Sequence, residues 1–302
     1  MNTIVPNMSG QLSDTESDVP LKALGTIKRL RADLNEDPFC LVFNEYNANN
    51  LDFALAEIAE GRKIAAIFKG ALDKNLRSAA IEKLTFHANK ELYEGAEAVG
   101  RIGRSLYENQ FGPDREARYF NEASANLDAS RSIFHPYISP TDKLRILCDE
   151  LPSFKGANLL RLKNGTAFVG LVRYLDNGAK ILPHTDNINW DMPNSLRCQH
   201  MSLQVAFNGM IQAPSSGGAV TIYNRRPSKV EYDAYREAEP NQYALKKEFL
   251  PLRSVTIEPE AGDIYLFNAS LPHEVSETAG DTRYTISGFI GVDNQRKIWL
   301  FS

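Results

Sequence analysis

Several features that define other protein classes are scarce or missing in this 302-residue chain. Only three cysteines occur, Cys40, Cys148 and Cys198, and no two of them form a C-x-x-C pair. The odd number and wide spacing argue against a disulfide framework or a structural zinc site, and they favour a reducing, cytoplasmic environment. We expect the three thiols to be buried as small apolar side chains.

Long apolar runs and long basic runs are also missing. No stretch reaches the roughly 20 apolar residues that span a bilayer. Residues 1–20 lack the basic start and apolar core of a signal peptide, and we interpret them as a polar, flexible tail. Lys and Arg total 34 against 38 Asp and Glu, and no basic run is long enough to follow a phosphate backbone. The sequence therefore predicts a small-molecule partner rather than nucleic acid or membrane.

The first half of the chain predicts mainly helices. Apolar residues recur at helical spacing in 49–63, and 139–151 has the pattern of a short helix with an N-terminal cap. Residues 74–111 predict a longer helical region that is interrupted at one of its glycines. We therefore expect residues 21–157 to form a helical region that packs on the rest of the chain.

From residue 158 the pattern changes to short runs of strand-forming residues separated by turns. Such runs without helical spacers predict antiparallel sheets, and a double-sheet jelly roll is their natural closed form. The predicted fold is mainly β with flanking helices (α+β), with a double-stranded β-helix, cupin-like core over 158–302. Residues 227–250 form a polar, helical-looking insert, of the kind that builds lids or substrate walls. The two halves together are expected to act as one catalytic domain.

Histidine is rare as well, with five in the chain, and one of them begins a pattern of metal ligands. In ILPHTDNINW, His184 precedes Asp186 by two positions, so that both side chains point to one face of an extended strand. His273 ends another apolar strand. Two histidines and one carboxylate are the ligand set of non-haem iron(II) oxygenases. An H-x-D pair alone is weak evidence, because such pairs also form simple hydrogen bonds in turns.

Residues beyond the histidines make the pattern more specific. Ten positions after His273, Arg283 opens a strand, and Thr285 shares its face. A guanidinium that faces a cavity needs a carboxylate, whereas the ordinary alternative is an ion pair at a strand edge. Asn268 and Gln204, on neighbouring strands, are further candidates for orienting a metal ligand or a cosubstrate.

With these residues in order, the chain resembles the iron(II)/2-oxoglutarate-dependent oxygenases that have a double-stranded β-helix core. The resemblance covers roughly 158–302. It implies that His184, Asp186 and His273 are the catalytic residues that bind Fe(II). It also implies that the Arg-x-Thr motif beginning at Arg283 binds the distal carboxylate of 2-oxoglutarate, and that O2 is the cosubstrate.

A narrower resemblance is to the freestanding small-molecule group of this superfamily. That group includes halogenases acting on indole alkaloids and hydroxylases of amino-acid derivatives. In the halogenases a Gly or Ala replaces the carboxylate and leaves a site for chloride, whereas this chain has Asp186. The resemblance therefore implies hydroxylation of an unactivated C–H bond in an amino-acid derivative or natural-product intermediate, with release of succinate and CO2.

Some alternatives stay open. The same cofactor chemistry gives desaturation, epoxidation or cyclisation, and the outcome depends on how the substrate is placed. A non-catalytic jelly-roll binding protein, or a metal-only hydrolase or cupin, would be of another class, but each leaves Arg283 without a role. Neither the identity of the substrate nor the oligomeric state follows from the sequence, and a homodimer is one option.

Overall fold

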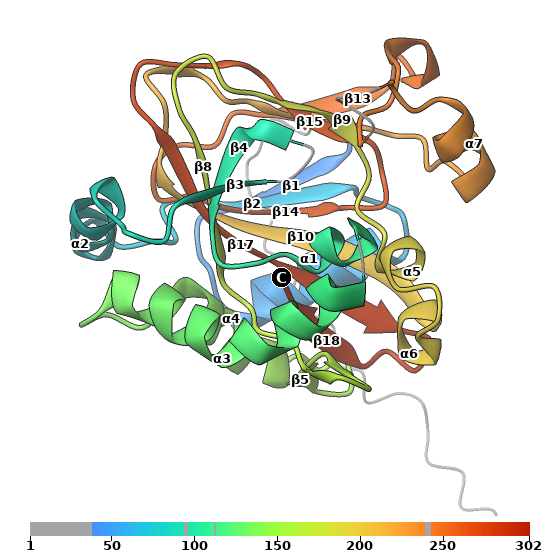
Figure 1. Ribbon diagram of the computed structural model, residues 1–302, viewed down its shortest axis with the longest axis horizontal. Helices are drawn as coiled ribbons and strands as arrows, with labels where there is room; N and C mark the ends of the chain where they lie inside the picture. The colour runs from blue at the N-terminus through green and yellow to red at the C-terminus, as the bar shows by residue number, and fades with distance from the viewer. Residues whose placement is uncertain (1–37, 94–95, 112, 239–242) are drawn as a thin grey trace, which may run out of the picture. The chain divides into compact units, whose positions relative to one another are not determined.

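A ten-stranded sheet is the main element of the computed structural model, which describes residues 38–93, 96–111, 113–238 and 243–302 (Figure 1). Its strands are β1 (Cys40–Phe43), β2 (Ala65–Phe68), β3 (Glu91–Tyr93), β4 (Ala96–Ile102), β5 (Ala157–Leu159), β8 (Leu171–Leu175), β10 (Met201–Gln212), β14 (Ile264–Asn268), β17 (Arg283–Asp293) and β18 (Ile298–Phe301). Their order is β1-β2-β14-β10-β17-β8-β4-β3, and β18 pairs with both β17 and β5. All pairs are antiparallel except β1–β2 and β18–β5.

A smaller sheet contains four antiparallel strands. They are β9 (Ile181–His184), β12 (Val220–Tyr223), β13 (Ser254–Ile257) and β15 (His273–Val275). Their order is β13-β12-β15-β9. Two short ribbons accompany the sheets. These are β6 (Arg161–Leu162) with β7 (Gly165–Thr166), and β11 (Ser216–Gly217) with β16 (Thr278–Ala279).

The alternating side chains of β14 show why the fold has layers. Successive residues of a strand point to opposite faces of its sheet. Tyr265 and Phe267 join the apolar cluster that contains Val220 of the smaller sheet. Ile264 and Leu266 join a second cluster, on the helical side. Both faces of the large sheet are thus buried, and the predicted double-stranded β-helix with flanking helices is confirmed.

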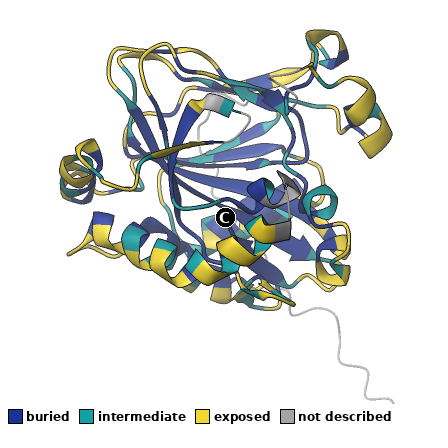
Figure 2. Ribbon diagram, in the orientation of Figure 1, coloured by how far each residue is buried: buried dark blue, intermediate teal, exposed yellow. Residues whose placement is uncertain are grey.

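Some of the helices cover the face of the large sheet that points away from the smaller sheet, whereas others lie beside the smaller sheet and in the insert 227–250. The helices are α1 (Ala48–Ala59), α2 (Lys74–Thr85), α3 (Pro113–Phe134), α4 (Pro140–Asp149), α5 (Ile188–Asp191), α6 (Leu196–Gln199) and α7 (Lys229–Ala234), with 3-10 turns η1 (Leu106–Phe111) and η2 (Lys247–Phe249). Figure 2 shows their outward faces exposed and the strands mainly buried. Within the described residues, no helix has the length and apolar character of a membrane span.

The strands expected after residue 158 are all present, but the helical expectation for the first half is only partly right. Helices α1 and α4 form where predicted, and Ser139 is the N-cap of α4. The described residues of 74–111, however, form one α-helix, α2, followed by strands β3 and β4 and the 3-10 turn η1. With β1 and β2, these strands extend the large sheet across the expected boundary at residue 158.

A close approach between β4 and β8 explains this difference. Gly100 lies opposite Tyr174, and a Cβ atom at Gly100 would stand 1.9 Å from the tyrosine ring. Val99 and Ile102 on the same strand are buried. Tertiary pairing therefore overrides the helix-forming composition of this segment.

Two further predictions fall partly or wholly outside the described residues. The expected tail, residues 1–20, is among them. The described part of the insert 227–250 is only partly helical, since it contains α7, η2 and an isolated bridge between Arg236 and Leu245; residues 239–242 lie outside the described residues. The three cysteines are free and buried, as expected.

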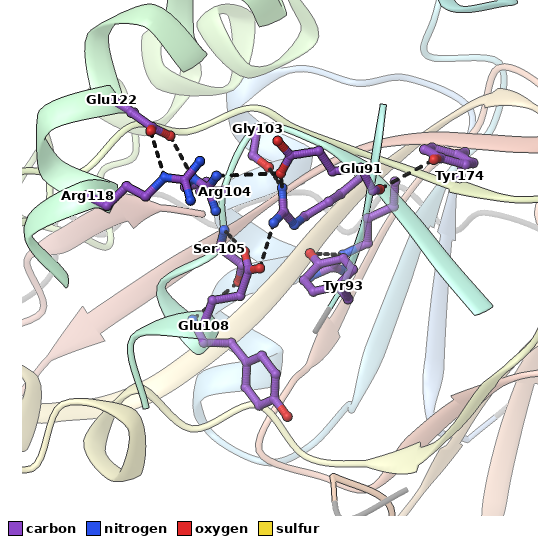
Figure 3. Close-up of polar contacts among 12 residues, drawn as sticks. Glu91, Tyr93, Gly103, Arg104, Ser105, Glu108, Arg118, Glu122 and Tyr174 are labelled. Carbon is purple, nitrogen blue, oxygen red and sulfur yellow. Dashed lines mark hydrogen bonds and ion pairs between the residues drawn. The ribbon is translucent and has the colours of Figure 1, made fainter. Parts of the chain in front are cut away.

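A buried ion pair fixes the β3–β4–η1 wall (Figure 3). The Arg101 guanidinium donates to Glu108 at 2.7 Å and to Glu91 at 2.8 Å. Arg101 and Glu108 have side chains that are only 5% exposed. The other carboxylate oxygen of Glu108 accepts from the backbone N–H of Ser105. Because both charges are desolvated, removing Glu108 leaves Arg101 with the half-exposed Glu91 as its acid partner.

We expect Glu108→Gln to lower the free energy of unfolding by about 3 kcal/mol, because it leaves the buried Arg101 charge poorly paired. Asp233→Asn is the matched control, since it removes one carboxylate from an exposed ion pair with Lys229. The control should change stability by less than about 0.5 kcal/mol. Urea denaturation followed by circular dichroism measures both values. Equal effects of the two substitutions would show that the buried pair has no special role.

Candidate functional site

Two histidines face each other across neighbouring strands of the smaller sheet. His184 ends β9, and its register partner is His273, which begins β15. Their ring centroids are 4.3 Å apart. In each ring, Nδ1 is bonded to the backbone carbonyl two residues earlier, at 2.8 Å to Leu182 and 2.9 Å to Leu271. The carbonyl makes Nδ1 the protonated nitrogen, so Nε2 carries a free lone pair in both histidines.

Asp186 completes this cluster from the loop that follows β9. Its backbone N–H donates to the carbonyl of Ala269, which ties the loop to the segment between β14 and β15. Its carboxylate oxygens lie 3.8 Å from Nε2 of His184 and 3.4 Å from Nε2 of His273. One ligand atom from each of the three residues lies within 4.8 Å of the other two. Two imidazoles and one carboxylate at these distances can hold one metal ion.

The protonation states of this cluster suit a metal, since ligands must bind in their deprotonated form. Burial, followed by the nearby His273, lowers the pKa of His184 to about 4. Burial alone would raise the pKa of Asp186, but the neighbouring His273 and His184 hold it below its usual range. At neutral pH, His184 is therefore neutral and Asp186 is ionised.

A second unusual group is the buried guanidinium of Arg283, which is 3% exposed. One of its Nη atoms donates to the hydroxyl of Tyr265 at 2.7 Å. Its Nε has no hydrogen-bond partner, and neither does the buried hydroxyl of Thr285, two residues along the same strand face. None of the ion pairs among the described residues involves Arg283. Buried donors of this kind are rare without a partner, and a carboxylate would satisfy both residues.

The histidine cluster and Arg283 open into one cavity of about 820 Å³, including the solvent at its mouth. Its polar lining, apart from tyrosines, consists of Ser105, Arg173, His184, Thr185, Asp186, Asn208, His273, Arg283 and Thr285. The rest is aromatic or aliphatic and includes five tyrosines, Tyr93, Tyr107, Tyr232, Tyr243 and Tyr265. A largely apolar cavity with a few converging polar groups is typical of a small-molecule site.

Arg173 is a second arginine of the cavity, and the sequence left open whether it or Tyr174 points inward. Arg173 lies opposite Thr285 of β17 and lines the cavity, whereas Tyr174 packs on the other face, in the cluster with Tyr284. The Nε of Arg173 donates to the hydroxyl of Tyr93 at 3.2 Å. Burial alone would lower the pKa of Arg173, but Tyr93 and the Asp186 carboxylate raise it, so the guanidinium keeps its charge.

The insert 227–250 contributes a wall of the cavity. Tyr232 and Tyr243 both line it, and the hydroxyl of Tyr232 donates to the carbonyl of Tyr243 at 2.7 Å. The insert is bonded to β9 in two places. The N–H of Leu182 donates to the hydroxyl of Tyr243, and the N–H of Leu245 donates to the carbonyl of Pro183. The wall is thus fixed to the strand that carries His184.

Two residues expected to contact the cosubstrate do not line the cavity. The side-chain oxygen of Gln204 accepts from the backbone N–H of Ile188 at 2.7 Å. The side-chain oxygen of Asn268 accepts from the N–H of Ser270 at 3.1 Å. Each side chain bonds to a backbone group instead of lining the cavity, and the expectation that the two residues orient a metal ligand or the cosubstrate stays a prediction. Both residues brace the loops that follow Asp186 and precede His273.

Sequence reasoning missed the residues that the first half supplies. Tyr93 and Tyr107 line the cavity from β3 and η1. No local pattern marks them, since their strand and turn were expected to be helical. Tyr265 could have been found, because strict alternation along IYLFN places it on the face opposite Leu266.

Comparison with known proteins gives one family match. The model of a family described as the carrier-protein-independent halogenase WelO5 matches residues 43–302. Among solved structures, the N-substituted L-amino acid dioxygenase from Burkholderia ambifaria AMMD is similar, with a TM-score of 0.58 and 18% sequence identity. The similarity covers 83% of this chain and 91% of that chain, and it supports the fold.

Two curated relatives are similar in sequence over shorter stretches. The L-isoleucine 3(1)-dioxygenase of Pantoea ananatis is 31% identical over 46% of this chain and 48% of its own length. The L-gamma-glutamyl-L-propargylglycine hydroxylase of Streptantibioticus cattleyicolor is 34% identical over 42% and 45%. The chain therefore spans about half the length of the curated relatives it matches.

We expect His273→Ala to weaken the binding of a divalent metal at least about 100-fold, because it removes one of three ligand atoms. Anaerobic titration with Fe(II) against a metal indicator measures the dissociation constant. The exposed His200 gives the control, since His200→Ala removes an imidazole that lies outside the cluster. A similar loss in both variants would contradict the site.

Proposed function

Because the chain belongs to the family described as the carrier-protein-independent halogenase WelO5, we propose that it is an oxygenase dependent on Fe(II) and 2-oxoglutarate. Its substrate is a free small molecule, and its reaction is hydroxylation of an unactivated C–H bond. One observation carries this proposal. A His-Asp-His cluster and a buried guanidinium without an acid partner among the described residues open into the same cavity.

His184, Asp186 and His273 would hold the iron. Their two Nε2 atoms and one carboxylate form the mixed donor set of a facial triad, which leaves coordination positions open for other ligands. When bound there, iron with 2-oxoglutarate and O2 supplies the oxidation of the C–H bond, coupled to decarboxylation of 2-oxoglutarate to succinate and CO2. The protein supplies the residues that orient these groups in the cavity.

Arg283 and Thr285 would bind the distal carboxylate of 2-oxoglutarate. The free Nε of the guanidinium and the free hydroxyl of Thr285 are the two donors that such a carboxylate would satisfy. Tyr265 holds the guanidinium in place through its hydroxyl. A hydrolase that uses only a metal would leave these buried donors without a ligand.

Hydroxylation is favoured over halogenation by Asp186. Its carboxylate stands between the two histidines, where halide would need an open position. The names of the two curated relatives, a dioxygenase and a hydroxylase, support the same choice. Both of those names also refer to amino acids or their derivatives, and we propose a substrate of this general class.

The aromatic walls would position the substrate over the iron. Tyr107 from η1 and the two tyrosines of the insert lie on the walls of the same cavity. Burial raises the pKa of Tyr107, so its hydroxyl stays protonated. A rigid, mostly apolar cavity holds one C–H bond at the required place.

We expect Arg283→Ala to raise the dissociation constant of 2-oxoglutarate at least about tenfold, since it removes a charge-assisted hydrogen bond. The affinity for Fe(II) should stay nearly the same, because Arg283 is not part of the metal cluster. Anaerobic titration of the Fe(II) enzyme with 2-oxoglutarate, followed by visible absorption, gives the first value.

Thr285→Val is the graded companion variant, because it removes one neutral donor and keeps the shape of the side chain. It should raise the dissociation constant of 2-oxoglutarate less than Arg283→Ala does. Unchanged affinity for 2-oxoglutarate in Arg283→Ala would rule out the assigned cosubstrate site.

A further inference from the structure

The cavity contains a second cationic group that the proposed cofactors leave unused. Arg173 lines the cavity, and its one hydrogen bond within the described residues joins Nε to the hydroxyl of Tyr93. None of the ion pairs in the described part of the chain includes Arg173. Its two Nη groups are thus available to a ligand, and a charged guanidinium in a partly buried site is costly without an anion.

The neighbouring arginine shows that the fold does neutralise guanidinium groups where no ligand binds. Arg101 lies directly opposite Arg173 on β4, and it is paired with Glu108 and Glu91. Like charges that face each other across strands repel, so one of the two must be compensated. The chain pairs Arg101 with two acids of its own. Arg173 is hydrogen-bonded only to a phenol among the described residues, and the nearby Asp186 carboxylate is assigned to the metal cluster.

On the premise of the proposed function, the charges of the cavity indicate the charge of the ligand that Arg173 binds. A divalent iron with Asp186 has one net positive charge, and bound 2-oxoglutarate brings two negative charges. Arg283 balances the distal carboxylate. The cavity is then neutral apart from Arg173, whose single positive charge suits a single anionic group of another ligand.

We propose that Arg173 binds a carboxylate of the substrate, so that the substrate is a carboxylic acid rather than an uncharged molecule. The planar fork of a guanidinium matches a carboxylate with two parallel hydrogen bonds. The hydroxyl of Tyr93 accepts from Nε, so its own proton is free to donate to the same anion. The aromatic walls then contact the apolar remainder of the substrate.

The alternative is that Arg173 assists 2-oxoglutarate near the metal. The Asp186 carboxylate is close enough to raise the pKa of Arg173, so this alternative has a physical basis. The two roles differ in whether the affinity for the substrate or the affinity for 2-oxoglutarate falls when Arg173 is changed. Variants Arg173→Gln and Arg173→Lys separate them, and Arg226→Gln, at an exposed arginine that does not line the cavity, is the control.

The experiment uses the anaerobic Fe(II) enzyme and two titrations. In the first, 2-oxoglutarate is added and its dissociation constant is read from the visible absorption band. In the second, free L-amino acids and their primary amides are added to the 2-oxoglutarate complex, and the shift of the band is followed. Each pair of probes keeps the side chain and the ammonium group and differs only in the carboxylate. Succinate release in air is the parallel readout.

We expect wild type to respond to at least one acid and about tenfold or more weakly to its amide. Arg173→Gln should raise the half-saturating concentration of that acid about 10- to 100-fold, the loss expected for a charge-assisted hydrogen bond. It should also abolish the preference for the acid. Arg173→Lys should restore part of the affinity, and Arg226→Gln should behave as wild type. The dissociation constant of 2-oxoglutarate should change less than about threefold throughout.

Three results would overturn the proposal. The first is a large loss of 2-oxoglutarate affinity in Arg173→Gln, which would assign Arg173 to the cosubstrate. The second is an equal response of wild type to acids and amides, and the third is no response to any acid. Failure of the proposed function would look different, because wild type would then show no absorption band with Fe(II) and 2-oxoglutarate at all.

Discussion

The pairing of β9 with β15 is the constraint on which the rest of the site depends. It sets His184 opposite His273, and the carbonyl groups of Leu182 and Leu271 then fix both rings through Nδ1. A slip of one residue in this register would turn one imidazole to the other face of the sheet. The small sheet and the Asp186 loop therefore act together, since neither alone brings three ligand atoms to one point.

The metal cluster could be predicted from the sequence because its geometry is local. The H-x-D pair is a short pattern, and His273 and Arg283 each lie at a strand boundary. The structure differs from the expectation in that Asp186 lies in the loop after β9 and His273 begins β15. The strands after residue 158 could also be found, because their pattern is local too. The side chains of Gln204 and Asn268 could not be placed, because whether they reach the cavity depends on register and on loops that they brace.

The strands of the first half could not be predicted from local sequence, because they form by pairing with strands that are distant in the sequence. The segment around Gly100 has the composition of a helix, and only the ring of Tyr174, some seventy positions away in the sequence, requires a glycine there. The tyrosines that the first half contributes to the cavity were not predicted either, because their segment was expected to be helical. The insert posed the same difficulty, since its tyrosines face the cavity only because Leu245 and Tyr243 bond to β9.

Charge compensation divides the arginines of this sheet into two kinds. Arg101, Arg173 and Thr285 lie in one row across β4, β8 and β17, so their side chains share a face. Glu108, from η1, reaches Arg101 and makes it part of the wall. No such acid among the described residues pairs with Arg173 or Arg283. Burial makes an uncompensated guanidinium costly, so two of them in one cavity indicate that anionic ligands bind there. The pairing of Arg101 with Glu108 shows that the same sheet can supply an acid partner to an arginine.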